Sequence, residues 1–484
     1  MPLAIPIPIL SAALPELLLA GLICLVFGVD LFTPRAAKMR VGVLSFLGIL
    51  VVAAATILMW KERAETFSGM FLLDGYALFF KLLFLAVTAL SILISLQYLK
   101  VEDINFGEYY GLMLFATLGM MIMAAGGDLI SIYLGLELMS ISIYVLVGFI
   151  KKDTASQEAA LKYFLLGAFA SAILLYGMAL TYGLTGSTNL KEIAGSLTAS
   201  PGFMDNPALT MAIVLVVVGF AFKMALVPFH MWAPDAYHGA PTSIAAYMSV
   251  GAKAAAFAGL VRILMVAFSA LDVKWNVLLW VLSAFSMTWG NVAAIAQTNI
   301  KRMLAYSSIA HAGYLLMGVV AGGRTGLTAL LFYLAVYIFM NIGAFSMVIL
   351  LCREGFRGDR IEDFQGLART HPAAGLAFVV FFLSLAGIPP TAGFVAKLYI
   401  FGAAIEKGYV WLAVIGVLNS AVSVYYYFRV VMLMYMYEVK GIPRLSSSKA
   451  LIAALLIMVG ATFLLGIFPG PFLEAAKASV TVFL

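Results

Sequence analysis

Four charged side chains stand in the middle of long apolar runs of this sequence. Glu137 lies in LISIYLGLELMSISIYVL, Lys223 in VVVGFAFKMALVPFH, Lys253 in MSVGAKAAAFAGL and Lys397 in PTAGFVAKLYIF. Placing such a charge at the centre of a membrane-spanning helix costs about 2.5–3.5 kcal/mol. We therefore expect protein partners or water around each of the four.

The residue types suggest proton transfer. Burial favours a neutral lysine, whereas a nearby carboxylate favours the ammonium form. If an ion pair of Glu137 with Lys223 opens and closes, the lysine would therefore bind a proton when the pair closes and release it when the pair opens. Lys253 and Lys397 would continue this relay through bound water. Static ion pairs that hold helices together are the alternative interpretation.

Histidines and one helical pair extend the set of candidates. His230 and His311 are candidate relay groups, because neutral imidazole both donates and accepts hydrogen bonds. A buried histidine that is simply satisfied by hydrogen bonds explains either one equally well. Glu158 and Lys162 have the i, i+4 spacing of a salt bridge on one helix face, which is the simpler reading of that pair.

The composition indicates a membrane protein. Hydrophobic residues make up 64% of the 484 residues and charged residues only 11%, too few charges to cover a water-soluble surface. The two cysteines, Cys24 and Cys352, lie in no metal-ligand spacing. There is also no phosphate-binding glycine loop and no basic aromatic patch. We therefore expect no metal, cofactor or nucleic acid on this chain.

Apolar runs long enough to cross a bilayer recur along the whole chain, so we expect one all-α integral membrane domain over residues 1–484. The tail from Pro469 looks like a short interfacial segment. The runs predict about fourteen spans, near 9–32, 41–60, 74–97, 109–126, 128–150, 159–184, 208–227, 241–267, 275–298, 302–322, 326–352, 373–402, 408–437 and 449–469.

Lysine and arginine are distributed unevenly between the two sides of these spans. The odd-numbered loops hold about 15 of them, whereas the even-numbered loops and the termini hold about 7. The side with more positive charge is usually cytoplasmic. This predicts that both termini lie on the outer, periplasmic face.

Two spans carry helix breakers. The seventh contains Pro228, Pro234 and Pro241, and the twelfth contains Gly387 followed by Pro389 and Pro390. We expect irregular backbone near 227–241 and 387–393, which is tolerated at membrane depth only where protein or water satisfies it. In the second break we expect Lys397 to face the bundle interior, with water on the carbonyls that the prolines free.

The position of the breaks suggests an internal repeat. If residues 109–267 (spans 4–8) and 275–437 (spans 9–13) are two five-helix units, each break falls in the fourth helix of its unit. Units with an odd number of helices insert with opposite topology, and broken helices at matching positions mark an ion path. Residues 1–108 would then be an N-terminal three-helix segment, and 448–484 a C-terminal helix and tail.

Several stretches resemble one known family. KMALVPFHMWAPDAYHGAPTSIAAYMSVGAKAA, NIKRMLAYSSIAHAGYLLMG and LAGIPPTAGFVAKLYIF are similar to the antiporter-like membrane subunits of proton-pumping NADH:quinone oxidoreductase, respiratory complex I. TYGLTGSTNL and GDRIEDFQGLARTHP resemble the N type. The chain lacks the long lateral helix of the L type, and Lys397 stands where the M type usually has glutamate.

The resemblance assigns roles to individual residues. Glu137 and Lys223 would be the ion pair of the fifth and seventh spans. Lys253 would be the central relay group, and Lys397 the terminal group towards the outer face or the next subunit. Four further positions match the family with less settled roles, namely Glu158, Lys162, His230 and Tyr306.

The resemblance also implies an activity that the chain would share with its complex. It would be a translocase subunit that couples electron transfer from NADH to quinone to proton transfer through the relay, without redox catalysis of its own. FMN, iron–sulfur clusters, NADH and quinone would bind to other subunits. Its partners would be the M-type subunit and small subunits of the K, J, A and H types in a bacterial inner membrane.

Three other functions compete with this one. A free-standing multi-subunit cation/proton antiporter would share the core, but Lys397 and the N-type loops argue against it. A solute carrier would need a spread of solute-binding groups at the breaks, where instead titratable residues follow one another. A scaffold of inert helices leaves the buried lysines unexplained.

Overall fold

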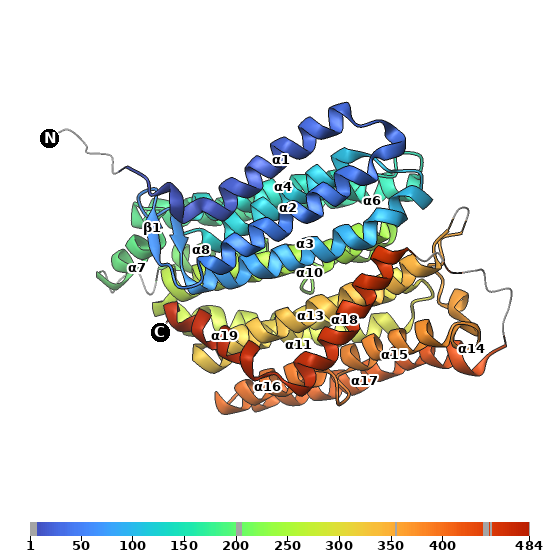
Figure 1. The fold of residues 1–484 in the computed structure, drawn as a ribbon. Helices are drawn as coiled ribbons and strands as arrows, with labels where there is room; N and C mark the ends of the chain where they lie inside the picture. Colours follow the sequence, from blue (N-terminus) through green and yellow to red (C-terminus); the bar gives the residue numbers. More distant parts are fainter. Residues whose placement is uncertain (1–6, 200–205, 354–355, 439–444, 446–447, 484) are drawn as a thin grey trace.

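The structure is a computed structural model that describes residues 7–199, 206–353, 356–438, 445 and 448–483. Almost all of the described chain is helical (Figure 1). The first half contains α1 (Leu14–Phe32), α2 (Met39–Leu58), β1 (Ala64–Thr66), β2 (Phe71–Leu73), α3 (Gly75–Val101), α4 (Gly107–Ala125), α5 (Leu129–Val147), α6 (Thr154–Thr185), α7 (Leu190–Ala199), α8 (Pro207–Met224), α9 (Trp232–Gly239) and α10 (Thr242–Arg262). The second half contains α11 (Asp272–Ile295), α12 (Ile300–Ala321), α13 (Gly323–Leu351), α14 (Leu367–Thr370), α15 (Pro372–Ala386), α16 (Ala392–Glu406), α17 (Val410–Met436), α18 (Lys449–Ile467) and α19 (Gly470–Val480).

The predicted spans are confirmed as helices. Within the described ranges, 13 helices are long and apolar enough to cross a membrane, and the shorter apolar helix Pro372–Ala386 adds the first part of the twelfth span. The span predicted at 241–267 is α10 continued by a π-helical turn, Ile263–Ala267. The all-helical membrane fold inferred from composition therefore holds, with helix ends within a few residues of those expected.

Short polar side chains set where several helices begin. Such a residue at the N-cap accepts a hydrogen bond from a backbone N–H of the first turn, which otherwise has no partner inside the helix. Six spans start in this way, with N-caps Asp74, Asp128, Asp153, Asn206, Asn299 and Ser448. These caps fix the membrane depth at which each helix starts, and so the depth of the charges that it carries.

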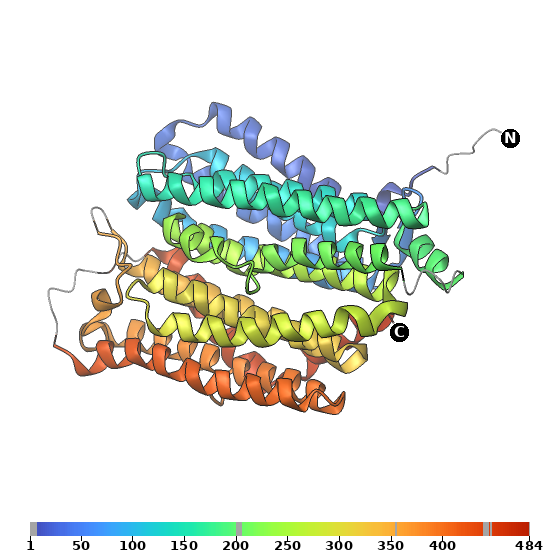
Figure 2. The same ribbon diagram turned by 180° about the vertical axis from the view of Figure 1, so that it is seen from behind.

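The core of the bundle is formed by α10, α12 and α13, whose side chains are almost entirely buried. Seen from behind, α6 (teal) and α17 (orange-red) lie on opposite flanks (Figure 2), and both present many exposed apolar side chains. The helices that carry Lys253 and His311, α10 and α12, are therefore the ones most shielded from lipid.

The seventh span is broken, although over a shorter stretch than predicted. Helix α8 ends at a left-handed C-cap, Ala225, whose φ is 58°. The indole of Trp232 donates to the carbonyl of Phe222 (2.9 Å), and Ser286 Oγ accepts from Val227 N (2.9 Å). Within 227–241, residues 232–239 form the short helix α9, because Pro234 falls in its first turn, where no N–H is needed.

The twelfth span is broken where predicted. Helix α15 ends at Ala386, the left-handed Gly387 follows with φ 82°, and α16 starts at Ala392. A side chain at Gly393 would collide with the carbonyl of Ser384, so this glycine lets α16 approach α15 closely. The Ser384 hydroxyl also accepts a hydrogen bond from Gly393 N at 3.1 Å.

Four small elements were not predicted. The hairpin β1–β2, α7 and α19 lie at one end of the bundle, and α14 lies at the other (Figure 1). The tail expected after Pro469 is the helix α19. Its last turns pack on α3, and Phe483 stacks edge-on against Tyr76 with ring centres 4.8 Å apart. The C-terminal segment is thus tied to α3 at this end of the bundle.

Candidate functional site

Lys223 lies in the last turn of α8, directly before the first break, and its side chain is 2% exposed. Its ammonium donates to Ser140 Oγ (2.8 Å) and to the Tyr144 hydroxyl (2.9 Å), both on α5. The rings of Tyr144 and Tyr163 lie 5.1 and 5.9 Å from the Nζ atom. The lysine is therefore held by hydroxyls and aromatic faces.

The predicted ion pair of Glu137 with Lys223 is open in the structure, because no carboxylate of the described chain lies within 4 Å of Lys223 Nζ. That the pair opens and closes stays a prediction. Glu137 Oε1 instead accepts a hydrogen bond from Ser171 Oγ on α6 at 2.5 Å. The Glu137 side chain points towards the α5–α6 flank and is only half buried. The carboxylate still acts electrostatically on Lys223, and Ser140 lies between them along α5.

Lys253, on α10, is 1% exposed. Its ammonium donates to the backbone carbonyl of Ser308 at 2.8 Å and makes a very short contact with the Ser308 hydroxyl. The hydroxyls of Tyr237 and Tyr337 both approach this serine. Three hydroxyl groups are thus gathered at the centre of the bundle around one buried lysine.

His311 lies one helical turn beyond Ser308 on α12 and is 1% exposed. Its Nδ1 atom is 2.8 Å from the Tyr333 hydroxyl, and its Nε2 atom is 3.5 Å from the Tyr427 hydroxyl. Both Lys253 and Lys397 act electrostatically on the imidazole. His311 is therefore near enough to both lysines to respond to their charges.

Lys397 faces the bundle interior at the second break, as predicted, and is 3% exposed. Its ammonium donates to the carbonyls of Leu385 (3.0 Å) and Ala386 (2.9 Å) and to Ser420 Oγ (2.8 Å). The lysine itself, where we expected water, thus satisfies carbonyls at the end of α15. The ring of Tyr314 lies 5.0 Å from its Nζ atom.

His230 and Tyr306 lie at the edge of the first break, where both are half buried. Their ring centres are 6.5 Å apart, and Trp289 lies at the same distance from His230. His230 Nδ1 has no hydrogen-bond partner among the residues described. Neither residue contacts a relay lysine directly, so their part in proton transfer stays a prediction.

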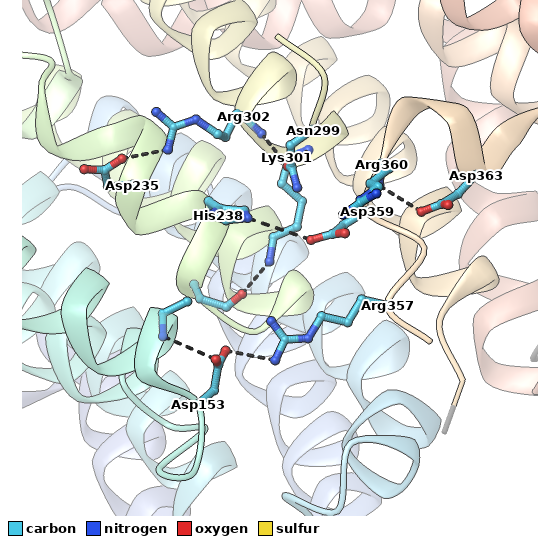
Figure 3. Close-up of polar contacts among 12 residues, drawn as sticks. Asp153, Asp235, His238, Asn299, Lys301, Arg302, Arg357, Asp359, Arg360 and Asp363 are labelled. Carbon is cyan, nitrogen blue, oxygen red and sulfur yellow. Dashed lines mark hydrogen bonds and ion pairs between the residues drawn. The ribbon is translucent and has the colours of Figure 1, made fainter. Parts of the chain in front are cut away.

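Glu158 and Lys162 form the expected salt bridge, at 2.6 Å, on an exposed part of α6. Lys162 also reaches Asp235 on α9 (3.0 Å), which in turn binds Arg302 on α12 (2.7 Å; Figure 3). Arg302 and Lys162 hold the pKa of Asp235 below its usual value. These charged side chains lie at the surface on the side of the odd-numbered loops, which we call the loop side. They tie α9 to its neighbours but do not enter the core.

Sequence reasoning missed two buried ion pairs. Arg262, at the end of α10, holds Asp74 with both amino groups (2.8 and 3.0 Å) and also donates to the carbonyl of Ala124. Lys81, on α3, lies 2.8 Å from Glu16 on α1 without the angles of a hydrogen bond. Lys81 lies inside an apolar run just as Lys223 does. This position in the sequence could have identified it as a buried charge that needs a partner.

We expect the Asp74–Arg262 pair to be structural. Asp74→Ala leaves the buried Arg262 without its counter-charge, which typically costs about 3–5 kcal/mol, so the assembled protein in detergent should unfold at a markedly lower temperature. Glu474→Ala removes the exposed partner of Lys477 and is the matched control, with no change expected. Equal melting temperatures for the two variants would show that the buried pair contributes nothing.

The arrangement as a whole can carry protons. Lys223, Lys253 and Lys397 are all enclosed, and each contacts at least one hydroxyl that can both donate and accept. His311 supplies an imidazole near the last two. Among the described residues no group of three or more histidine, cysteine or acidic side chains could hold a metal ion.

The chain is similar in sequence to known membrane proteins. Residues 126–423 match the family described as NADH:quinone oxidoreductase/Mrp antiporter, TM. This stretch includes Glu137, His311 and the buried lysines Lys223, Lys253 and Lys397. Over 474 residues the chain is 47% identical to NADH-quinone oxidoreductase subunit N of Trichlorobacter lovleyi, which covers 97% of both chains.

Solved structures show the same fold. A chain of respiratory complex I from Thermus thermophilus with bound aureothin is 34% identical, with a TM-score of 0.81, covering 96% of this chain and 100% of that one. A chain of the Mrp complex from Dietzia sp. DQ12-45-1b has a TM-score of 0.86 over 97% of both chains. It is only 23% identical, so that likeness shows the fold alone.

Proposed function

The chain belongs to the family of membrane subunits that NADH:quinone oxidoreductases share with Mrp antiporters, and on this premise we propose that it is the N-type, proton-translocating subunit of an NADH:quinone oxidoreductase. Its similarity to subunit N relatives extends over nearly its whole length. In this role it is part of a proton-translocating enzyme and performs no redox chemistry itself.

One observation carries the proton-transfer part of the proposal. Lys223, Lys253 and Lys397 are buried and bonded only to neutral groups of the described chain, whereas Arg262 and Lys81 are buried against carboxylates. A static ion pair keeps its counter-charge in permanent contact. Lysines without such a contact can exchange protons, which distinguishes a relay from the purely structural alternative.

The relay would run from Glu137 and Lys223 at the first break, through Lys253 and His311, to Lys397 at the second. Moving one charge against 100 mV costs about 2.3 kcal/mol. Opening or closing the gap between Glu137 and Lys223 changes the electrostatic free energy of the lysine. A signal from elsewhere in the complex that moves α5 relative to α8 would thus drive proton release.

The two breaks fall in the fourth helix of two consecutive groups, α4, α5, α6, α8/α9 and α10, then α11, α12, α13, α15/α16 and α17. We propose that these groups, residues 109–267 and 275–437, are inverted repeats. Left-handed caps at Ala225 and Gly387 end the first part of both broken helices, which supports matching positions.

In this role the chain would work beside other subunits in a membrane. FMN, iron–sulfur clusters, NADH and quinone would belong to other subunits, and the M-type and small K-, J-, A- and H-type subunits would be the neighbours in the membrane. The chain would lie in a bacterial inner membrane with both termini on the periplasmic face. The excess of lysine and arginine in the odd-numbered loops supports this orientation.

Purification from native membranes tests the proposal. A tagged copy of the chain should bring down a complex that contains flavin and iron–sulfur clusters and reduces quinone with NADH. The rival function, a free-standing Mrp-type antiporter, predicts co-purification with other membrane subunits and with no redox centre. Recovery of such a redox-free complex would contradict the proposal.

A further inference from the structure

Lys301 is a buried lysine at the loop-side end of the bundle that the relay does not use. It lies in the first turn of α12 and is 6% exposed. Its ammonium donates to the carbonyl of Ala240 (2.7 Å), between α9 and α10. A small cavity beside it is lined by Glu102 and Asp359 as well, so a cation and two carboxylates meet at this point.

The cavity connects to the loop-side surface. Glu102 and Arg357 line both this cavity and a wider depression of about 710 Å³. Glu102 accepts a hydrogen bond from the Cys352 thiol at 2.9 Å, and Arg357 is paired with Asp153 at 2.9 Å. These two side chains therefore separate Lys301 from solvent.

The segment 356–364, between α13 and α14, contributes Arg357 and Asp359 to the lining of the cavity, and both side chains are drawn in Figure 3. It is held by backbone hydrogen bonds from Ile300 N to Asp359 O (2.8 Å) and from Ile361 N to Thr298 O (2.9 Å). The Asp359 carboxylate lies 3.9 Å from His238 on α9. The segment 356–364 is thus attached to α9 and to the start of α12. Both of these helices lie between Lys301 and the centre of the bundle.

On its inner side, α12 leads from Lys301 to the central lysine. Ser308, the contact of Lys253, lies seven residues further along, which is about 10 Å of helix. The hydroxyls of Tyr237 and Tyr337 approach Ser308 but have no hydrogen-bond partner among the described residues. Buried hydroxyls in this situation commonly bind water.

We propose that Glu102, Lys301 and Asp359 form the loop-side proton entry to Lys253, with Lys301 as the proton-transfer residue. This rests on the proposed function. Once Lys253 has given up its proton, the ammonium of Lys301 passes a proton inward through water, Tyr237 and Ser308. The neutral amine of Lys301 is then reprotonated by a carboxylate at the opening, which takes a proton from the water outside. Only O–H and N–H bonds form and break, and each group returns to its starting state.

The test uses the assembled complex in inverted membrane vesicles, whose outer surface is the loop side, with NADH as fuel and a potential-sensitive dye as readout. We expect Lys301→Ala to slow formation of the membrane potential by roughly 100-fold, the lower end of what a positioned proton-transfer group contributes. Methylammonium, which fits the space left by the side chain, should restore much of it. Glu102→Gln should slow it less, because Asp359 remains.

Lys152→Ala, at an exposed lysine on the same face, is the matched control and should behave as wild type. Normal pumping by assembled Lys301→Ala would overturn the proposal. So would a loss that methylammonium leaves unchanged, because Lys301 would then only cap the Ala240 carbonyl. Wild-type pumping by Lys223→Ala would instead contradict the proposed function, so the two failures are distinguishable.

Discussion

Lys223→Ala should largely abolish proton pumping, with a small residual rate, while the complex still assembles. The lysine is 2% exposed, and no other cation of the described chain lies in its pocket, so nothing replaces it in proton transfer. Its loss leaves Ser140 bonded to the Leu136 carbonyl, which limits the cost to folding. Dye quenching in vesicles measures pumping, and native gel electrophoresis measures assembly.

Lys223→Arg separates proton transfer from a structural role. Arginine keeps the positive charge and the hydrogen-bond donors but does not release its proton at physiological pH. The variant should therefore assemble and largely fail to pump, as Lys223→Ala does. If arginine supports normal pumping, Lys223 acts as a fixed charge and the relay does not pass through it.

Glu137→Gln should impair the same step. The carboxylate is the acidic group that acts on Lys223, and amide substitution removes an opposite charge that favours the ammonium form. Because Gln can still take part in the hydrogen bond with Ser171, the helix packing should be preserved. We expect a loss of roughly tenfold in pumping rate, equivalent to about 1.4 kcal/mol.

The double variant shows whether the two residues act as one unit. Residues in one network typically have coupling energies of about 0.5–3 kcal/mol. Glu137→Gln combined with Lys223→Ala should therefore pump no less than Lys223→Ala alone. Ser171→Ala, which removes only the hydroxyl that binds Glu137, is the control for a local packing effect. Losses that multiply would mean that Glu137 serves a separate path.

The sequence predicted the helices and the breaks well because their causes are local. Membrane-spanning helices follow from the length of apolar runs, and the second break follows from Gly387, Pro389 and Pro390. The first break is shorter than predicted at Pro234, because a proline in the first turn starts a helix as readily as it ends one. Whether Pro234 starts or ends a helix depends on where that helix begins. Here it begins at Trp232, and tertiary contacts set this start.

The site was predicted less completely, because its contacts join distant segments. Depth in an apolar run identified Lys223, Lys253 and Lys397, but the partner of Lys223 was assigned by charge to Glu137. The structure gives it Ser140 and Tyr144, and hydroxyl residues are too common in helices to be singled out. Asp74 lies at a span end, where sequence alone predicts contact with water, yet it is held by Arg262.

The chemical nature of the lysine partners makes the two ends of the relay unequal. Ser140 and Tyr144 can reverse their hydrogen bonds, accepting from an ammonium or donating to a neutral amine. The carbonyls of Leu385 and Ala386 can only accept, and with Ser420 they occupy all three N–H groups of Lys397. A neutral Lys397 keeps two N–H groups for the two carbonyls and accepts from the Ser420 hydroxyl, so only one of its three hydrogen bonds can reverse. Lys397 can therefore hold the end of α15 against α16 whether or not it carries the extra proton.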